Sequence, residues 1–204
     1  MGTLDTNCYI AKLKGNSEEF ELIIDPGMES IGWIKQHCVN PKAVLNTHGH
    51  YDHVWSNSIV AKEFDIPIYT PQEDCFMLEF DHSGIDMPLS KADYAVGSDV
   101  ASKNDTNNDS KFLFDGIVVE FFHFPGHTKG CSVIKIDNHI FSGDFIFAGS
   151  IGRSDFMYSN VDDMRESVAR VLQWDSNVDI HPGHGRDTTL DDERRQLEYW
   201  KNNI

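Results

Sequence analysis

Short apolar runs, each closed by glycine, proline or a turn residue, dominate the hydrophobic pattern of this chain. Residues 9–13 and 20–25 flank a turn at Gly15-Asn16, and further runs follow at 43–45, 66–69, 117–124, 131–136, 139–143 and 178–181. Runs of this length, rich in β-branched and aromatic residues, predict strands.

Segments with apolar residues at helical spacing alternate with these predicted strands. We predict helices over 28–37 and 52–64, one that starts behind the N-cap Asn160, and a last one over about 190–201. In the third, Val161, Met164, Val168, Val171 and Leu172 recur on one face. The alternation of strands and helices predicts an α/β fold.

One polar segment, at about residues 81–111, interrupts the pattern. Residues 101–111 hold too few apolar side chains to order themselves, so a mobile loop is predicted there. For residues 81–89 two interpretations stay open, a solvated loop and part of a lid over a cleft. We expect a single domain over 1–204 with this variable loop inside it.

Composition and charge narrow the function. The 204 residues are 40% apolar, enough for one packed core, and the net charge is −16. Such an acidic chain repels phosphate backbones, so we expect no nucleic-acid partner, although an acidic small substrate is not excluded. No segment is long and apolar enough for a membrane span, and the first residues do not form a signal peptide, which predicts a cytoplasmic protein with no membrane partner.

The chemistry is concentrated in Thr47-His48-Gly49-His50-Tyr51-Asp52-His53. Imidazole and carboxylate are common metal ligands, and four of them in one turn are too close together to serve a single tetrahedral ion. Two metal ions are therefore predicted. A His-rich surface turn with no metal is the alternative.

Three further ligand-type residues follow predicted strands in the same way. His127 comes after 117–124, Asp144 after 139–143 and His184 after 178–181. If these strands lie side by side with the one before His48, their ends meet at one cleft, where α/β layers commonly bind ligands. Unrelated surface histidines would not share this placement, which favours the metal site.

Taken together, His48-x-His50-x-Asp52-His53, His127 in Pro-Gly-His-Thr, Asp144 in Ser-Gly-Asp and His184 in Pro-Gly-His-Gly resemble the metallo-β-lactamase superfamily. Within it the glyoxalase II type, the hydroxyacylglutathione hydrolases, is the most similar. Residues 6–10, 25–27 and 149–155 fit the same group, and the resemblance runs from about Asn7 to the end.

The resemblance implies a four-layer αββα sandwich, two mixed β-sheets flanked by helices with the metals at one edge. It implies a first metal on His48, His50 and His127, a second on Asp52, His53 and His184, and Asp144 as the bridging ligand. Asp52 and Asp144 are then the carboxylates expected at the catalytic centre, and the bridging Asp144 distinguishes this group from β-lactamases proper. Full-length glyoxalase II resembles this chain plus a helical domain that grips glutathione. Because only residues 185–204 follow His184, the glutathione anchors cannot be carried over.

The ligand set predicts a hydrolase. Two cations that share a carboxylate and a water lower the pKa of that water and supply a hydroxide nucleophile. A thiolate leaves readily without strong acid assistance, so a small-molecule thioester is the expected substrate. Zn²⁺ is the favoured metal, with Fe²⁺ and Mn²⁺ possible because the same ligands accept them. The sequence does not indicate an oligomeric state.

Two other functions stay open. Gly152-Arg153-Ser154-Asp155-Phe156 resembles a mononuclear iron dioxygenase that acts on persulfides and would use only His48, His127 and Asp144. The other is a non-catalytic metal-binding module, which the open coordination positions of such a site disfavour.

Smaller predictions concern four residues near the motifs. Arg153 and Asp155 are expected to pair and brace their loop, with a substrate carboxylate as the alternative partner of Arg153. His181 is a candidate to orient His184. Cys131, one of four scattered cysteines, is expected to be a buried core residue, although its position also allows an approach to the metals.

Overall fold

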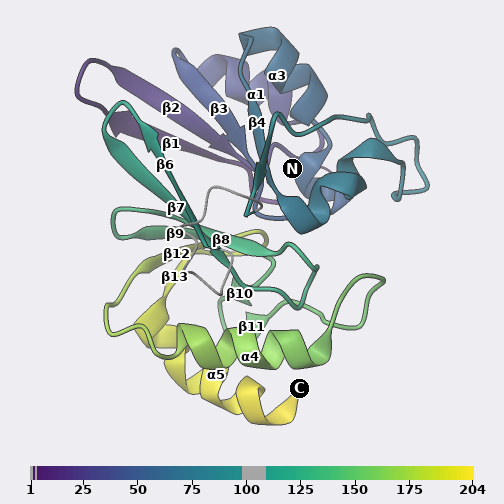
Figure 1. Ribbon diagram of the computed structural model, residues 1–204, viewed down its shortest axis with the longest axis vertical. Helices are drawn as coiled ribbons and strands as arrows, with labels where there is room; N and C mark the ends of the chain where they lie inside the picture. Colours follow the sequence, from purple (N-terminus) through teal and green to yellow (C-terminus); the bar gives the residue numbers. More distant parts are fainter. Residues whose placement is uncertain (1, 3, 98–108) are drawn as a thin grey trace.

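The computed structural model describes residue 2 and residues 4–97 and 109–204. Two mixed sheets lie face to face, with helices on the outer side of each, which makes four layers (Figure 1). The predicted α/β class and αββα architecture are confirmed.

The first sheet has the order β1-β2-β3-β4-β5. Its strands are β1 (Tyr9–Lys14), β2 (Glu19–Ile24), β3 (Pro41–Leu45), β4 (Ile68–Pro71) and β5 (Tyr94–Val96). β1 and β2 form an antiparallel hairpin, and β2 to β5 run parallel. The helices α1 (Ser30–His37) and α3 (Asn57–Phe64) accompany this sheet on its outer face, and η1 (Gln72–Glu79) follows β4.

The second sheet has the order β13-β12-β9-β8-β7-β6. Its strands are β6 (Ser110–Phe114), β7 (Ile117–His123), β8 (Ser132–Ile136), β9 (His139–Gly143), β12 (Asp179–Pro182) and β13 (Thr188–Thr189). The helices α4 (Val161–Val171) and α5 (Leu190–Asn203) cover its outer face, and the small hairpin of β10 (Ile146–Phe147) and β11 (Ser150–Ile151) lies beside them (Figure 1).

The side chains of a strand point alternately to its two faces, and this explains how the layers pack together. Leu22 and Ile24 of β2 face the second sheet, where they pack with residues such as Phe121, whereas Ile23 between them packs toward α1. Successive strand residues point to opposite faces, so a strand that is apolar throughout must be covered on both sides. β2 and β3 are therefore buried between the other sheet and the helices.

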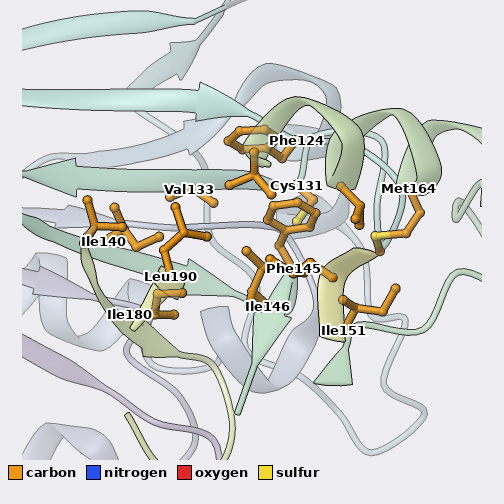
Figure 2. Close-up of a cluster of buried hydrophobic side chains, with 14 residues drawn as sticks. Phe124, Cys131, Val133, Ile140, Phe145, Ile146, Ile151, Met164, Ile180 and Leu190 are labelled. Carbon is orange, nitrogen blue, oxygen red and sulfur yellow. The ribbon is translucent and has the colours of Figure 1, made fainter. Parts of the chain in front are cut away.

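The outer face of the second sheet holds its own apolar cluster. Figure 2 shows Phe145, Ile146 and Ile151 between the strands and Met164 of α4. Asn160 caps α4 as predicted, because its side chain accepts from the backbone N–H groups of Asp162 and Asp163. Cys131 is completely buried in this cluster, in agreement with a core role.

The predicted helix over 52–64 is wrong as a single element, because the structure divides it into α2 (Tyr51–Val54) and α3. Ser56 lies at the break. Its N–H donates to the carbonyl of Pro26 at 2.9 Å, and its hydroxyl donates to the carbonyl of Gly27 at 2.7 Å. These tertiary hydrogen bonds take the donor that a continuous helix would have directed to residue 52. The break fixes α2 as a separate short turn.

The predicted loop at 81–111 is wrong at both of its strand segments. Residues 94–96 form β5, and residues 110 and 111 begin β6. Both segments find hydrogen-bonding partners in neighbouring strands, which composition alone does not reveal. Most of the polar stretch 101–111 lies outside the described residues.

Candidate metal centre and active site

The ends of four strands meet at one edge of the sandwich, as the sequence predicts. β12 is parallel to β9, and β7 runs the same way because β8 is antiparallel to both β7 and β9. The segments after β7, β9 and β12 therefore leave the second sheet at the same edge. The segment after β3 reaches them from the first sheet and carries the His-rich turn, whose last two candidate residues lie in α2.

Two groups of three candidate ligands gather here. His48, His50 and His127 offer nitrogen atoms that all lie within 4.8 Å of one another, and so do the ligand atoms of Asp52, His53 and His184. The structure thus brings together the two sets of three residues that the sequence predicts. Four of the six residues lie in the segment after β3 of the first sheet, whereas His127 and His184 follow β7 and β12 of the second, so only tertiary packing joins them.

Asp144 lies between the two groups. One of its oxygens, Oδ2, is 3.4 Å from Nε2 of His127 in the first group and 3.6 Å from Nε2 of His184 in the second. The other oxygen, Oδ1, is 3.3 Å from Nε2 of His53. A single carboxylate therefore faces both groups, which is the placement expected of a bridging ligand.

The site also passes a test of fit for metal ions. Nε2 of His48, Nε2 of His53 and Oδ1 of Asp144 are buried and have no hydrogen-bond partner among the described residues. Buried polar atoms in proteins are normally paired, so three orphaned atoms at one point call for a missing partner. They are two imidazole nitrogens and a carboxylate oxygen, which suit a divalent transition metal.

The remaining ring nitrogens are held by the protein. Nδ1 of His127 lies 2.8 Å from the carbonyl oxygen of Arg153, and Nδ1 of His184 lies 3.0 Å from that of Leu4. Nδ1 of His53 lies 3.0 Å from the carboxylate of Asp25. An acceptor at Nδ1 places the proton there and leaves Nε2 with a free lone pair toward the centre. These contacts orient three of the candidate ligands.

Asp25 serves both groups, although the sequence indicated no role for it. It is buried, and it accepts from the Thr47 N–H at 2.8 Å and from the Thr47 hydroxyl at 2.6 Å. The Thr47 oxygen in turn lies 3.1 Å from Nδ1 of His48. One carboxylate thus orients His53 directly and His48 through Thr47. The sequence signals at Asp25 are its position directly after a strand and its place in the segment 25–27 that fits the resemblance.

Asp74 ties the two ligand-bearing loops together, and no sequence signal pointed to it. From η1 its buried carboxylate accepts from the N–H of Gly49 at 3.0 Å, the N–H of Gly130 at 2.8 Å and the hydroxyl of Thr128 at 2.6 Å. Gly49 lies between two candidate ligands, and Thr128 is next to His127. Asp74 therefore fixes the distance between the His-rich turn and the loop after β7.

Gly126 explains why the Pro-Gly-His segment that follows β7 needs a glycine. Its φ of +140° is unfavourable for residues with a side chain, and a Cβ there would overlap the backbone of Met164. Only glycine lets this loop lie directly against the start of α4. The close packing positions the next residue, His127, toward the cleft.

Burial and mutual charge perturb the titration of the cluster in the absence of metal. Burial, together with the neighbouring His127, lowers the pKa of His50 to about 3. Burial opposes protonation of His184 as well, but hydrogen bonds to Asp144 and Asp52 outweigh it and raise the pKa of His184 to about 9. For Asp144 burial acts upward, yet His53 and His184 hold its pKa well below the usual range. The carboxylate is thus kept ionised, as a metal ligand must be.

Two smaller predictions have clear outcomes. Arg153 pairs with Asp155 through two hydrogen bonds of 2.9 Å, as expected. His181 does not orient His184, and that prediction is wrong. The His181 ring contacts His139 and Asp187, and Nδ1 of His184 instead lies 3.0 Å from the carbonyl oxygen of Leu4.

The fold and this cluster define a class, the metal-dependent hydrolases of the metallo-beta-lactamase superfamily. The family model with that description, "Metallo-beta-lactamase superfamily", matches residues 1–195, and the chain belongs to this family. Its His and Asp groups are consistent with a dinuclear metal site. Within the described residues, no helix has the length and apolar character needed to cross a membrane.

Named relatives support this assignment. The hydroxyacylglutathione hydrolase GloC of Haemophilus influenzae is 32% identical, with 88% of this chain and 87% of that protein covered. The BLEG-1 B3 metallo-beta-lactamase superposes with a TM-score of 0.82 at 26% identity, covering 98% of this chain and 96% of that one. TTHA1623, solved in a di-iron-bound form, superposes with a TM-score of 0.73 at 27% identity, with 96% of each chain covered.

Proposed function

We propose that this protein is a dinuclear metal-dependent hydrolase that cleaves thioesters. The observation that carries the proposal is the position of Asp144, whose Oδ2 lies 3.4 Å from His127 of one group and 3.6 Å from His184 of the other. A mononuclear or purely structural site has no need of a carboxylate between two groups of donors.

Each candidate residue would have a defined role at the centre. His48, His50 and His127 would hold one divalent cation and Asp52, His53 and His184 the other, with Asp144 shared. When bound, such a pair lowers the pKa of a water molecule toward neutrality and polarises the substrate carbonyl. Asp25, and the carbonyl groups of Arg153 and Leu4, keep the proton of each ring on the side away from the centre. Thr6 donates to Oδ2 of Asp52 at 2.7 Å and so fixes that carboxylate.

A protein nucleophile is not required, and the best candidate for one is disqualified. Cys131 is the cysteine next to the His127 loop, but it is fully buried, and burial raises the pKa of its thiol well above the usual range. A neutral buried thiol is a poor nucleophile.

The substrate preference then follows from the leaving group, since a thiolate departs without protonation and an amine does not. The name of the Haemophilus relative, a hydroxyacylglutathione hydrolase, supports a thioester.

The test begins with elemental analysis of the purified protein and a panel of thioesters, esters and a β-lactam. We expect about two metal equivalents and thioester turnover that a chelator abolishes and metal restores. Asp144→Asn should lose both metal and turnover. Asp175→Asn, at an exposed aspartate that is neither a candidate ligand nor a lining residue of the pocket at this centre, is the matched control and should lose neither. Undiminished turnover in the chelated protein contradicts the proposal.

The same experiment separates the other two functions. A persulfide dioxygenase would carry one iron and consume oxygen when given a persulfide, and Asp52→Asn would leave its activity intact. A non-catalytic module would carry metal and turn over nothing in the panel. The second donor group, with Asp52, His53 and His184 within 4.8 Å of one another, favours a dinuclear hydrolase over the mononuclear dioxygenase.

A further inference from the structure

A large pocket opens onto the candidate metal centre. Its volume is about 680 Å³, and the residues that line it include His50, Asp52, His127, Asp144 and His184. This is large enough for a substrate that extends well beyond a reacting carbonyl group. The rest of the wall decides what that extension is.

Much of the remaining lining is apolar. This apolar wall is formed by Leu4, Met77, Phe80, Phe147, Phe156 and Met157. Several of these side chains are unusually open to solvent, with Phe156 43% and Met157 76% exposed. Large apolar side chains that line a cleft and remain exposed mark a surface that a ligand covers.

Phe156 shows how closely this wall approaches the chemistry. Its ring centroid lies 6.0 Å from that of His50 and 5.9 Å from that of His127, in both cases edge-on. A substrate group against Phe156 would therefore lie directly beside the reacting carbonyl. Burial of that group would also exclude water from the first donor group.

Cationic side chains are scarce in the wall. Among the described lining residues other than histidines, Arg153 is the one with a positive charge, and it is already occupied. It forms a two-pronged pair with Asp155, and its guanidinium lies 4.1 Å above the Phe156 ring. The carboxylates of a glutathione thioester are anionic. Against this wall they would lose water without gaining a free cation.

Resting on the proposed hydrolase function, we infer that the physiological substrate is an uncharged, apolar acyl thioester, one whose acyl chain or aromatic group packs on Phe156 and Met157. Glutathione thioesters of small hydroxy acids would be poor substrates. The site would thus keep the reaction class of its hydroxyacylglutathione hydrolase relatives and differ from them in what it recognises.

Four thioesters, which combine two acyl groups with two thiols, test this inference. The acyl group is lactoyl or hexanoyl, and the thiol is glutathione or the neutral N-acetylcysteamine; kcat/KM is measured for each by release of the thiol. We expect hexanoyl-N-acetylcysteamine to be the best and S-lactoylglutathione the worst, with each change worth at least about tenfold. Faster turnover of S-lactoylglutathione than of the neutral hexanoyl thioester overturns the inference and leaves the hydrolase proposal standing.

Two variants connect the preference to the wall. Met157→Ser should lower kcat/KM for both hexanoyl substrates by about fivefold and leave the lactoyl substrates nearly unchanged. Leu113→Ser is the matched control, since Leu113 is 73% exposed and is not a lining residue of this pocket. Asp155→Asn frees Arg153 from its partner and should raise kcat/KM for the glutathione thioesters by about threefold, with the N-acetylcysteamine thioesters as internal reference. Equal effects on all four substrates in both variants contradict the inference.

Binding separates failure of this inference from failure of the proposed function. S-hexyl-N-acetylcysteamine and S-methylglutathione are thioethers that cannot be hydrolysed, and their dissociation constants for the metal-loaded protein are measured by calorimetry. Tighter binding of the neutral hexyl compound supports the apolar pocket even if no thioester is cleaved. Absence of cleavage would refute the hydrolase proposal and leave the pocket inference standing. Tighter binding of the glutathione compound overturns the pocket inference whatever the turnover.

Discussion

Removal of the Asp25 carboxylate should weaken both metal positions at once, although Asp25 lies behind the candidate ligands. The carboxylate accepts three hydrogen bonds, two from Thr47 and one from His53. Through the Thr47 hydroxyl it also controls Nδ1 of His48. His48 belongs to one donor group and His53 to the other, so both depend on one buried side chain.

The expected magnitudes follow from these contacts. In Asp25→Ala the N–H and O–H of Thr47 and the Nδ1–H of His53 are left buried without acceptors, at about 1–3 kcal/mol each. The loss of stability should therefore be at least about 3 kcal/mol. In Asp25→Asn the amide keeps one acceptor oxygen and sets its NH₂ against one of the donors, at about 1–3 kcal/mol. If that donor is His53, its proton moves to Nε2, the nitrogen that faces the centre.

Metal affinity is the decisive measurement for this prediction. Loss of an orienting partner typically weakens a metal site by about 10- to 100-fold. We expect competition against a chromophoric chelator to show a loss of this size at both equivalents in Asp25→Asn, and no change in the control Asp175→Asn. Urea unfolding of the metal-free proteins measures the separate effect on stability. An Asp25→Asn protein that folds and binds both metals as tightly as the parent would refute the orienting role.

Three further predictions concern the same centre. Gly183→Ala should abolish turnover and weaken metal binding, measured by the chelator assay, because a Cβ there would overlap the Asp144 carboxylate and the His53 ring; a fully active variant contradicts the packing described. Removal of the metals should lower Tm by several degrees, measured by scanning calorimetry with and without chelator, because ions that bind only the folded state stabilise it, and an unchanged Tm counts against a resident metal. In the metal-free protein, the raised pKa of His184 means that its protonated ring stabilises the fold fully below about pH 6.5, and this stabilisation is lost as pH rises through about 9. The metal-free His184→Gln variant should therefore lose less stability over that window, measured by urea unfolding. Parallel pH profiles of the two proteins would contradict that assignment.

The elements and the site followed from the sequence to different extents. Apolar runs closed by glycine or proline located β2, β3, β7, β8, β9 and β12 to within a few residues, because alternation and turn chemistry are local properties. The helix break at Ser56 and the strand β5 were missed, because each depends on hydrogen bonds to distant segments. For the same reason Asp74 was not predicted, because its three partners come from two separate loops.

The sequence by itself indicated which side chains could form the centre, since the seven candidate residues follow strands that short local signals locate. Only the tertiary structure decided what surrounds them: the carboxylate of Asp25 behind two histidines, the Arg153–Asp155 pair, and the apolar wall around Phe156 and Met157. The physical reason is that ligand identity is a property of single residues at strand ends. Orientation and substrate preference depend instead on contacts between segments far apart in the chain, and those contacts exist only when the two sheets pack together.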